Sequence, residues 1–302
     1  MRNTQDKAPL QCGALNFVLL AGSYSVCGQI QAASTASAAD FALNWLAAAA
    51  AVGMIWLAAA YIEPPLRNDS SGTRLFKLLA VIYLGFTAGC YLRGLIMLWR
   101  QWAYHETSPL VLAISAALLT LFGGSRGLRP ALRLCLPVSA AVLVFFIADT
   151  ALLAPEMSLS RLRLVYGAFS PQLFLKLLGA LLLPLPAAIL LRPADASDLH
   201  IPFQTGAVIG LSYLLLSALR SVLLLGSLTV WEAFPLLRTL TLVYVGPGLS
   251  RMDAWGLMAL TGAMMTAAIS MSAASLQLLS AYEKKKMISA LLMAVLTFMA
   301  IF

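Results

Sequence analysis

Residues 234–271 read FPLLRTLTLVYVGPGLSRMDAWGLMALTGAMMTAAISM. A short apolar segment opens at Pro235, carries Arg238 as its single charge, and reaches a Gly-Pro-Gly turn at 246–248 before a long apolar run. Proline is favoured at the first helical position, and glycine next to proline stops a helix. The pattern therefore predicts a helix lying on a membrane surface and a turn that feeds a membrane span.

The start of that span has its own signals. Ser250 suits the N-cap, because a hydroxyl there accepts hydrogen bonds from the first helical amides, and Asp253 at the third helical position favours the positive end of the helix dipole. The spacing of Arg251 and Asp253 does not put them on one helix face, so no helical ion pair is expected. Arg251 is then either an anchor in the lipid headgroups or part of a family pattern with Asp253.

Composition decides the protein class. The chain has 302 residues, of which 61% are hydrophobic and 11% are charged, whereas soluble domains are about half apolar and about a quarter charged. A transmembrane barrel would show short alternating segments instead of long apolar runs. We therefore expect an all-α polytopic membrane protein with a single domain over residues 1–302, since the longest polar connections, 63–74 and 192–204, are too short for a soluble domain.

The apolar runs predict about nine transmembrane helices. They cover residues 11–30, 41–61, 75–98, 109–122, 131–153, 171–191, 205–228, 254–281 and 287–302. The fourth run is short enough to be tilted, interfacial or partly re-entrant. The first run also resembles a cleaved signal peptide, but an uncleaved first span is the preferred interpretation.

The net charge of +8 fits membrane topology better than nucleic-acid binding, because the basic residues are scattered between apolar runs and form no basic patch interleaved with aromatic residues. A cytoplasmic N-terminus obeys the positive-inside rule. It places inside Arg2, Lys7, Arg67, Arg74, Lys77, Arg126, Arg129, Arg133, Arg192, Lys284, Lys285 and Lys286. It leaves outside Arg100, Arg161, Arg163, Arg238 and Arg251.

Two spans carry residues that can interrupt a helix. The first has a polar, glycine-bounded patch in mid-span, formed by Gly22, Ser23, Tyr24, Ser25 and Gly28. The sixth has Gly179 followed by Pro184 and Pro186, and the prolines remove backbone donors. Interrupted helices in two related halves mark the substrate site of many secondary transporters, and spans one and six would open two inverted five-helix repeats. Ordinary close packing at the glycines is the alternative.

Charged residues inside spans are costly and mark functional candidates. Four fall in the outer part of the membrane, namely Arg93, Asp149, Lys176 and Arg220. One hypothesis pairs Asp149 with Arg93 or Arg220 and leaves a second cation for a ligand carboxylate. The alternative is that the long basic side chains snorkel to the headgroups.

Nothing in the sequence predicts an enzyme, a cofactor or a metal. A Ser/His/Asp grouping, an HExxH motif and a phosphate-binding loop are all missing from the sequence. The cysteines lie at no metal-ligand spacing, and the two histidines fall in connections predicted on opposite sides of the membrane. We expect no metal site and no catalytic residues.

The order of these features resembles one known family. The stretch 234–265, with Arg251 and Asp253 leading into the eighth span, resembles the B-subunit permeases of bacterial spore germinant receptors, in the amino acid/polyamine/organocation transporter superfamily. Further matches are Thr107-Ser108-Pro109, Gly127-Leu128, Arg133, Pro137, Asp149 and residues 162–167. Family members usually have ten spans, so the resemblance implies a C-terminally shortened member.

The resemblance implies a LeuT-like inverted-repeat bundle whose first and sixth helices are broken around a small-molecule site. It implies an amino acid or other small germinant as ligand, held by the patch from Gly22 to Gly28 with Gly179 and Pro184 opposite. It also implies a germinant receptor A-subunit and a lipoprotein C-subunit as partners, in the spore inner membrane or the bacterial cell membrane. The alternatives are a stand-alone amino acid or ion transporter and a non-transporting membrane scaffold.

Overall fold

The computed structural model describes residues 8–32, 38–61, 71–161, 169–191, 200–226, 234–242 and 252–280. Within these ranges all regular structure is helical. The first half contains α1 (Ala8–Ala32), α2 (Ala38–Ala59), α3 (Ser71–Trp102), α4 (Pro109–Ser125), α5 (Leu128–Leu153) and the short helix η3 (Ala154–Glu156). The second half contains α6 (Pro171–Leu182), α7 (Leu185–Leu190), α8 (His200–Leu225), α9 (Pro235–Leu240) and α10 (Met252–Ser280).

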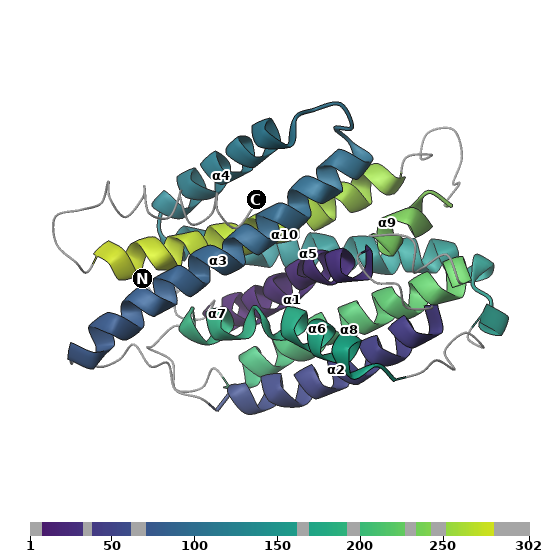
Figure 1. Ribbon diagram of the computed structural model, residues 1–302, viewed down its shortest axis with the longest axis horizontal. Helices are drawn as coiled ribbons and strands as arrows, with labels where there is room; N and C mark the ends of the chain where they lie inside the picture. The colour runs from purple at the N-terminus through teal and green to yellow at the C-terminus, as the bar shows by residue number, and fades with distance from the viewer. Residues whose placement is uncertain are drawn as a thin grey trace.

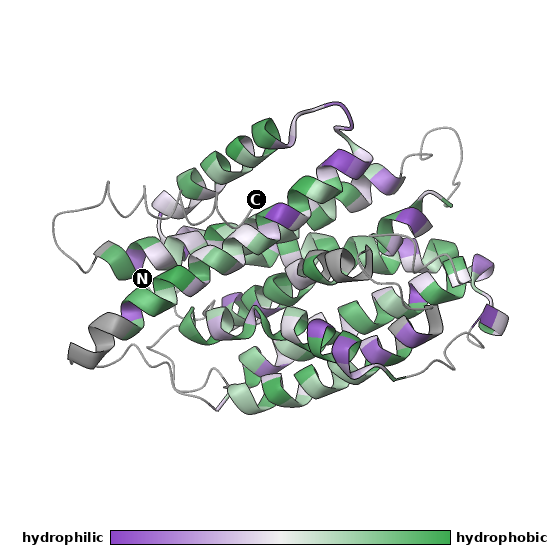
Figure 2. Cartoon of the chain, viewed as in Figure 1, coloured by the Kyte–Doolittle hydropathy of each residue, from purple (hydrophilic) through white to green (hydrophobic). Residues whose placement is uncertain are grey.

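These helices confirm that the apolar runs predicted between residues 11 and 281 are helical, because each contains a helix or a helix pair at its predicted place. In the described ranges, the helices long and apolar enough to cross a membrane are Phe76–Trp102, Leu128–Glu156, Pro171–Leu190, Ile201–Leu225 and Asp253–Leu279. Figure 2 shows them coloured mainly in the hydrophobic range. The ninth predicted span, 287–302, lies outside the described residues.

The bundle has two groups of helices with α1 between them. α10 packs against α3, α4 and α5, whereas α2 packs against α6, α7 and α8. α1 contacts both groups, through α3, α5 and α10 on one side and through α6 and α8 on the other. In Figure 1, α3, α4 and α10 lie above α1, and α2, α6, α7 and α8 lie below it.

Neighbouring contacts give the helix directions. Gly13 of α1 lies beside Gly206 of α8, and Phe17 lies one turn further on beside Tyr213, so α1 and α8 run parallel. In the opposite sense, Cys135 of α5 contacts Ser270 of α10. Gly256 of α10, one turn after that helix begins, faces Phe145 in the last third of α5, so α5 and α10 are antiparallel. This alternation is what consecutive membrane crossings require.

The sixth span is interrupted as predicted. Helix α6 ends at Leu182 and α7 begins at Leu185, with a turn between them. Pro184 and Pro186 have no amide hydrogen, so they cannot donate the hydrogen bonds that would join the two helices. The position of this break follows directly from local sequence chemistry.

The interruption predicted in the first span is wrong. Helix α1 continues from Ala8 to Ala32 through Gly22, Ser23, Tyr24, Ser25 and Gly28. The hydroxyl of Ser23 donates to the carbonyl oxygen of Leu20 at 2.7 Å, within the same helix. The polar patch is therefore accommodated in a regular helix, and the alternative of close packing describes Gly22 better.

Helix α9 departs from the surface helix predicted for it. Pro235 does open the helix, and Arg238 is exposed, but every other residue of α9 is buried. Its contacts are with α8 and α10, so it is packed on protein at one end of the bundle. Asp253 lies in the first turn of α10, whereas Ser250, Arg251 and the turn at 246–248 lie outside the described residues.

Candidate functional site

The break between α6 and α7 is covered by a side chain from α3. The phenol of Tyr83 donates a hydrogen bond to the carbonyl oxygen of Leu183, the residue at the turn. Pro184, next in the chain, is buried. A carbonyl released from a helix inside a membrane must find another donor, and Tyr83 supplies it.

Tyr83 belongs to a stripe of polar side chains on one face of α3, formed with Thr87 and Tyr91 at successive spacings of four residues. Thr87 is fully buried and donates to the carbonyl oxygen of Tyr83 at 2.9 Å. Tyr91 is also fully buried, and its phenol donates to the carbonyl oxygen of Leu19 in α1 at 2.6 Å. The stripe therefore connects α3 to the interrupted sixth span at one end and to α1 at the other.

Gly22 is the contact point of α1 with this stripe. A Cβ atom on Gly22 would lie 3.2 Å from the ring of Tyr91, which is tighter than ordinary van der Waals contact. The ring covers the glycine, and the phenol binds the backbone one turn before it. Gly22 therefore allows α3 to approach α1 closely at mid-helix.

Asn16 forms a second polar contact on α1, toward α8. Its Nδ2 donates to the carbonyl oxygen of Phe203 at 3.1 Å, while its buried Oδ1 has no hydrogen-bond partner. A buried amide oxygen without a partner is uncommon in a folded protein. Asn16 thus gives α1 an acceptor on a different face from the one that meets Tyr91.

The described predicted substrate-binding residues lie at different points of the bundle. Gly22 and Ser23 are buried in the bundle, and Pro184 is buried at the helix break. Gly179 is exposed, and a Cβ atom there would meet nothing within 4 Å. Tyr24, Ser25 and Gly28 lie in α1, but their side chains are outside the described part of the structure.

The charged residues divide into a buried pair and two exposed cations. Arg220 Nη1 lies 2.7 Å from Asp149 Oδ1, with the two side chains only 2% and 1% exposed. The predicted pairing of Asp149 is thus confirmed with Arg220 as partner. Arg93 and Lys176 are exposed, as the snorkelling alternative requires.

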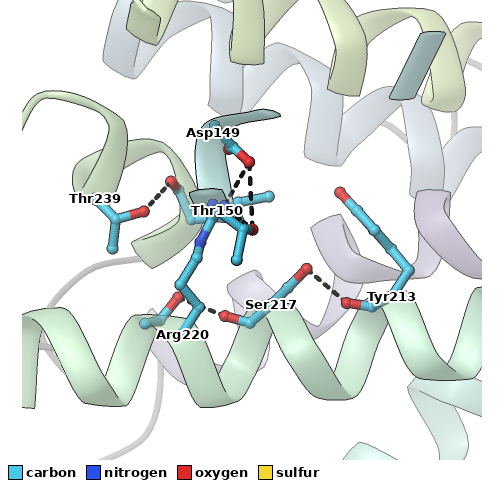
Figure 3. Close-up of polar contacts among 8 residues, drawn as sticks. Asp149, Thr150, Tyr213, Ser217, Arg220 and Thr239 are labelled. Atoms are coloured by element: carbon cyan, nitrogen blue, oxygen red, sulfur yellow. Dashed lines mark hydrogen bonds and ion pairs between the residues drawn. The ribbon is translucent and has the colours of Figure 1, made fainter. Parts of the chain in front are cut away.

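Figure 3 shows how the pair is held between α5 and α8, with α9 beside it. Arg220 rises from α8, and its Nη1 also donates to the hydroxyl of Thr150 at 3.0 Å. Thr150 in turn donates to Asp149 Oδ1 at 3.4 Å. The three side chains form a closed triangle that links the two helices.

An aromatic chain leads from this pair to α1. The guanidinium of Arg220 lies over the ring of Phe146, 5.0 Å from its centroid. Phe146 meets the ring of Tyr213 edge-on at 4.9 Å, and Tyr213 meets Phe17 of α1 at 5.5 Å. These contacts connect a charged residue near one end of the bundle with the helix at its centre.

The α3 stripe was not found from the sequence. Tyr83, Thr87 and Tyr91 share one face of an apolar span, and that spacing of polar residues is the signal that could have revealed them. Asn16 was missed as well, although an amide side chain inside a membrane span is itself a signal. Among the described residues, no group of three His, Cys, Asp or Glu side chains could hold a metal ion.

Comparison with known proteins identifies the fold but not a family. No protein-family model matches the chain, and no curated protein matches it. Among solved structures, a Na⁺-coupled sialic acid symporter in a substrate-bound outward-open state aligns with a TM-score of 0.59 at 13% identity, covering 96% of this chain and 71% of that chain. The chain is therefore an all-α polytopic membrane protein with the fold of LeuT-type transporters.

Proposed function

We propose that the chain is a small-solute-binding membrane protein of the secondary-transporter type, with its solute site at the break between α6 and α7. The interruption at Leu183 and Pro184 supports this most directly, because discontinuous helices form the central solute sites of transporters with this architecture. The break lies in a helix pair that contacts α1, the helix between the two groups. It is not an enzyme in this proposal.

The solute class is a small amphipathic molecule such as an amino acid. Tyr83 presents a phenol at the break, and Leu183 presents a carbonyl that is not tied into a helix. Because α1 is continuous, its amides are engaged within the helix, and the expected carboxylate site at Gly22 to Gly28 is not retained. Solute binding at the break instead replaces or rearranges the bond between Tyr83 and Leu183.

Conformational change in this proposal is a movement of the α2, α6, α7 and α8 group relative to the α3, α4, α5 and α10 group. A solute shifts such an equilibrium only by binding one arrangement more tightly than the other. The bond between Tyr83 and Leu183 joins the two groups beside the proposed site. Solute that competes for these atoms therefore has a direct means of changing their relative position.

The test is uptake of radiolabelled amino acids and of labelled sialic acid into liposomes that contain only this chain, with an imposed Na⁺ or proton gradient. We expect gradient-dependent uptake of at least one solute. The double variant Pro184→Ala/Pro186→Ala restores the missing amide donors, favours a continuous helix, and is expected to abolish uptake. Pro137→Ala is the matched control, because Pro137 lies within α5 and is exposed.

Absence of uptake and of binding for every solute would overturn this proposal in favour of a non-transporting scaffold. The observation that favours this second candidate is that α1 is continuous and that Tyr91 packs on it and donates a hydrogen bond to Leu19. Undiminished uptake in the Pro184→Ala/Pro186→Ala variant would place the site elsewhere in the bundle.

The finer proposal is a germinant-sensing subunit of a spore germinant receptor, supported by the order of Pro235, α9 and the Asp253-containing start of α10. It requires a membrane A-subunit and a lipoprotein C-subunit, in the spore inner membrane. Co-purification of both subunits with the tagged chain from spores, together with loss of an amino acid germination response on its deletion, is the expected result. Uptake by the chain alone, without either partner, favours the stand-alone transporter.

A further inference from the structure

The ion pair and the hydrogen bond of Arg220 involve only one of its three guanidinium nitrogens. Asp149 and Thr150 both bind Nη1, at 2.7 and 3.0 Å. The other two guanidinium nitrogens, Nε and Nη2, are buried and have no hydrogen-bond partner. One edge of a buried guanidinium is thus left with all of its donors unpaired.

This unpaired edge is costly in a buried position. Buried donors without a partner lose their hydration and gain nothing in return, and the penalty is larger when the group is charged. An arginine whose only purpose was to neutralise Asp149 would be expected to face it with two nitrogens, in the bidentate geometry that guanidinium and carboxylate prefer. Here only Nη1 contacts Asp149, and Nε and Nη2 have no partner, so the pair is not bidentate.

The neighbouring hydroxyls of Ser217 and Thr239 do not accept hydrogen bonds from Nε or Nη2 of Arg220. Ser217, one turn before Arg220 on α8, donates to the carbonyl oxygen of Tyr213 at 2.6 Å. Thr239, on the covering helix α9, donates to the carbonyl oxygen of Leu236 at 2.7 Å. Figure 3 shows both hydroxyls turned toward backbone oxygens of their own helices.

We propose that the Nε and Nη2 edge of Arg220 is a binding site for the carboxylate of a small solute. Two parallel N–H donors match the two oxygens of a carboxylate. Asp149 and Thr150 hold the guanidinium through Nη1, and the Phe146 ring supports its face, so the edge is fixed in orientation. This site lies between α5 and α8, apart from the α6–α7 break, and it goes beyond the proposed function by adding a second site and a ligand class.

The test uses the purified full chain in nanodiscs of zwitterionic lipid, with sodium propionate as the probe. Propionamide, which has the same shape without the charge, and inorganic phosphate at matched ionic strength are the comparison ligands. The measurement is the thermal unfolding midpoint as a function of ligand concentration, since a ligand that binds only the folded state raises it. We expect propionate to raise the midpoint and propionamide to leave it unchanged.

Arg220→Lys keeps the positive charge beside Asp149 but removes the two-donor edge. It is expected to raise the propionate concentration needed for half of the shift by about tenfold or more. Arg93→Lys is the matched control, because Arg93 is an exposed intramembrane arginine, and the propionate response should persist unchanged. An equal response in wild type and Arg220→Lys would overturn the proposal.

A second measurement needs no variant. Hydrogen–deuterium exchange of the wild-type chain should slow on propionate binding in peptides covering residues 217–224 and 235–240, and should not change in α4. No difference between propionate and propionamide in either measurement would also overturn the proposal. A larger shift with phosphate than with propionate would assign the edge to a phosphate group, as in a lipid headgroup or free phosphate, and would overturn the carboxylate assignment.

Discussion

Gly206 of α8 lies directly on the backbone of Gly13 of α1. A Cβ atom at Gly206 would meet the carbonyl oxygen of Gly13 at 2.2 Å and its Cα at 2.6 Å. One turn further along α8, a Cβ atom at Gly210 would meet the side chain of Leu20 at 2.8 Å. Two glycines at this spacing bring the helix axes close, which is how helices pack in the absence of a hydrophobic drive between them.

Gly206→Ala is therefore expected to destabilise the protein, by about 1–3 kcal/mol. The obstructing atoms belong to the backbone of Gly13, so no side-chain movement relieves the clash. The measurement is the free energy of unfolding in detergent, from denaturant titration of the purified protein.

Gly179→Ala is the matched control for this change. Gly179 is also a helical glycine, but nothing lies within 4 Å of its added Cβ atom. Alanine there should be neutral or stabilise the protein by up to about 1 kcal/mol, since glycine is the poorer helix former. Equal losses in the two variants would show that the α1–α8 contact is not as close as described.

Removing one member of the Asp149–Arg220 pair is expected to destabilise the protein by about 3–5 kcal/mol, because the remaining charge is left buried without its partner. Replacing both, as in Asp149→Leu/Arg220→Met, should recover much of that loss. A double-mutant cycle on the thermal or denaturant midpoint measures the coupling. Strict additivity of the single effects would contradict the pairing.

Tyr83→Phe is expected to destabilise the protein by about 1–3 kcal/mol, because the carbonyl of Leu183 loses its donor at the helix break. Hydrogen exchange in residues 179–190 should accelerate in the variant. Tyr104→Phe removes the same hydroxyl from an exposed residue and should change neither quantity. An unchanged exchange rate at the break would mean that Tyr83 does not hold it.

Trp99→Phe is expected to cost about 0.5–1.5 kcal/mol, since Trp99 Nε1 donates to the hydroxyl of Thr261 at 3.0 Å and joins α3 to α10. Thr261→Val should cost a similar amount, and the two changes together should cost less than their sum. Trp255→Phe, at an exposed tryptophan of α10, is the control. Its unfolding midpoint should match that of the wild type.

Local chemistry made much of the fold predictable. Long apolar runs set the spans, and Pro184 with Pro186 set the break in the sixth span, because a missing amide hydrogen acts wherever the chain packs. Gly127 similarly ends the connection between α4 and α5 with a positive φ of 97°, a conformation that glycine adopts readily. These features need no knowledge of neighbouring helices.

The predictions that were wrong or left open depend on contacts between distant parts of the chain. Gly22 to Gly28 has the composition of a helix break, but α1 stays regular where Tyr91 packs on Gly22 and binds Leu19. Asp149 had two candidate partners by depth, and only Arg220 faces it, whereas Arg93 lies on an exposed face of α3. Sequence gives the depth of a residue in the membrane, but not the rotation of its helix.

The polar stripe on α3 has a mechanical consequence. Tyr83 and Tyr91 stand on one rigid helix and each holds a carbonyl of a different neighbour, Leu183 beyond α6 and Leu19 in α1. A rotation of α3 that breaks one of these hydrogen bonds also displaces the other phenol. We therefore expect the two hydrogen bonds to break together. The bundle would then pass between its arrangements in a single all-or-none step, with no stable halfway form.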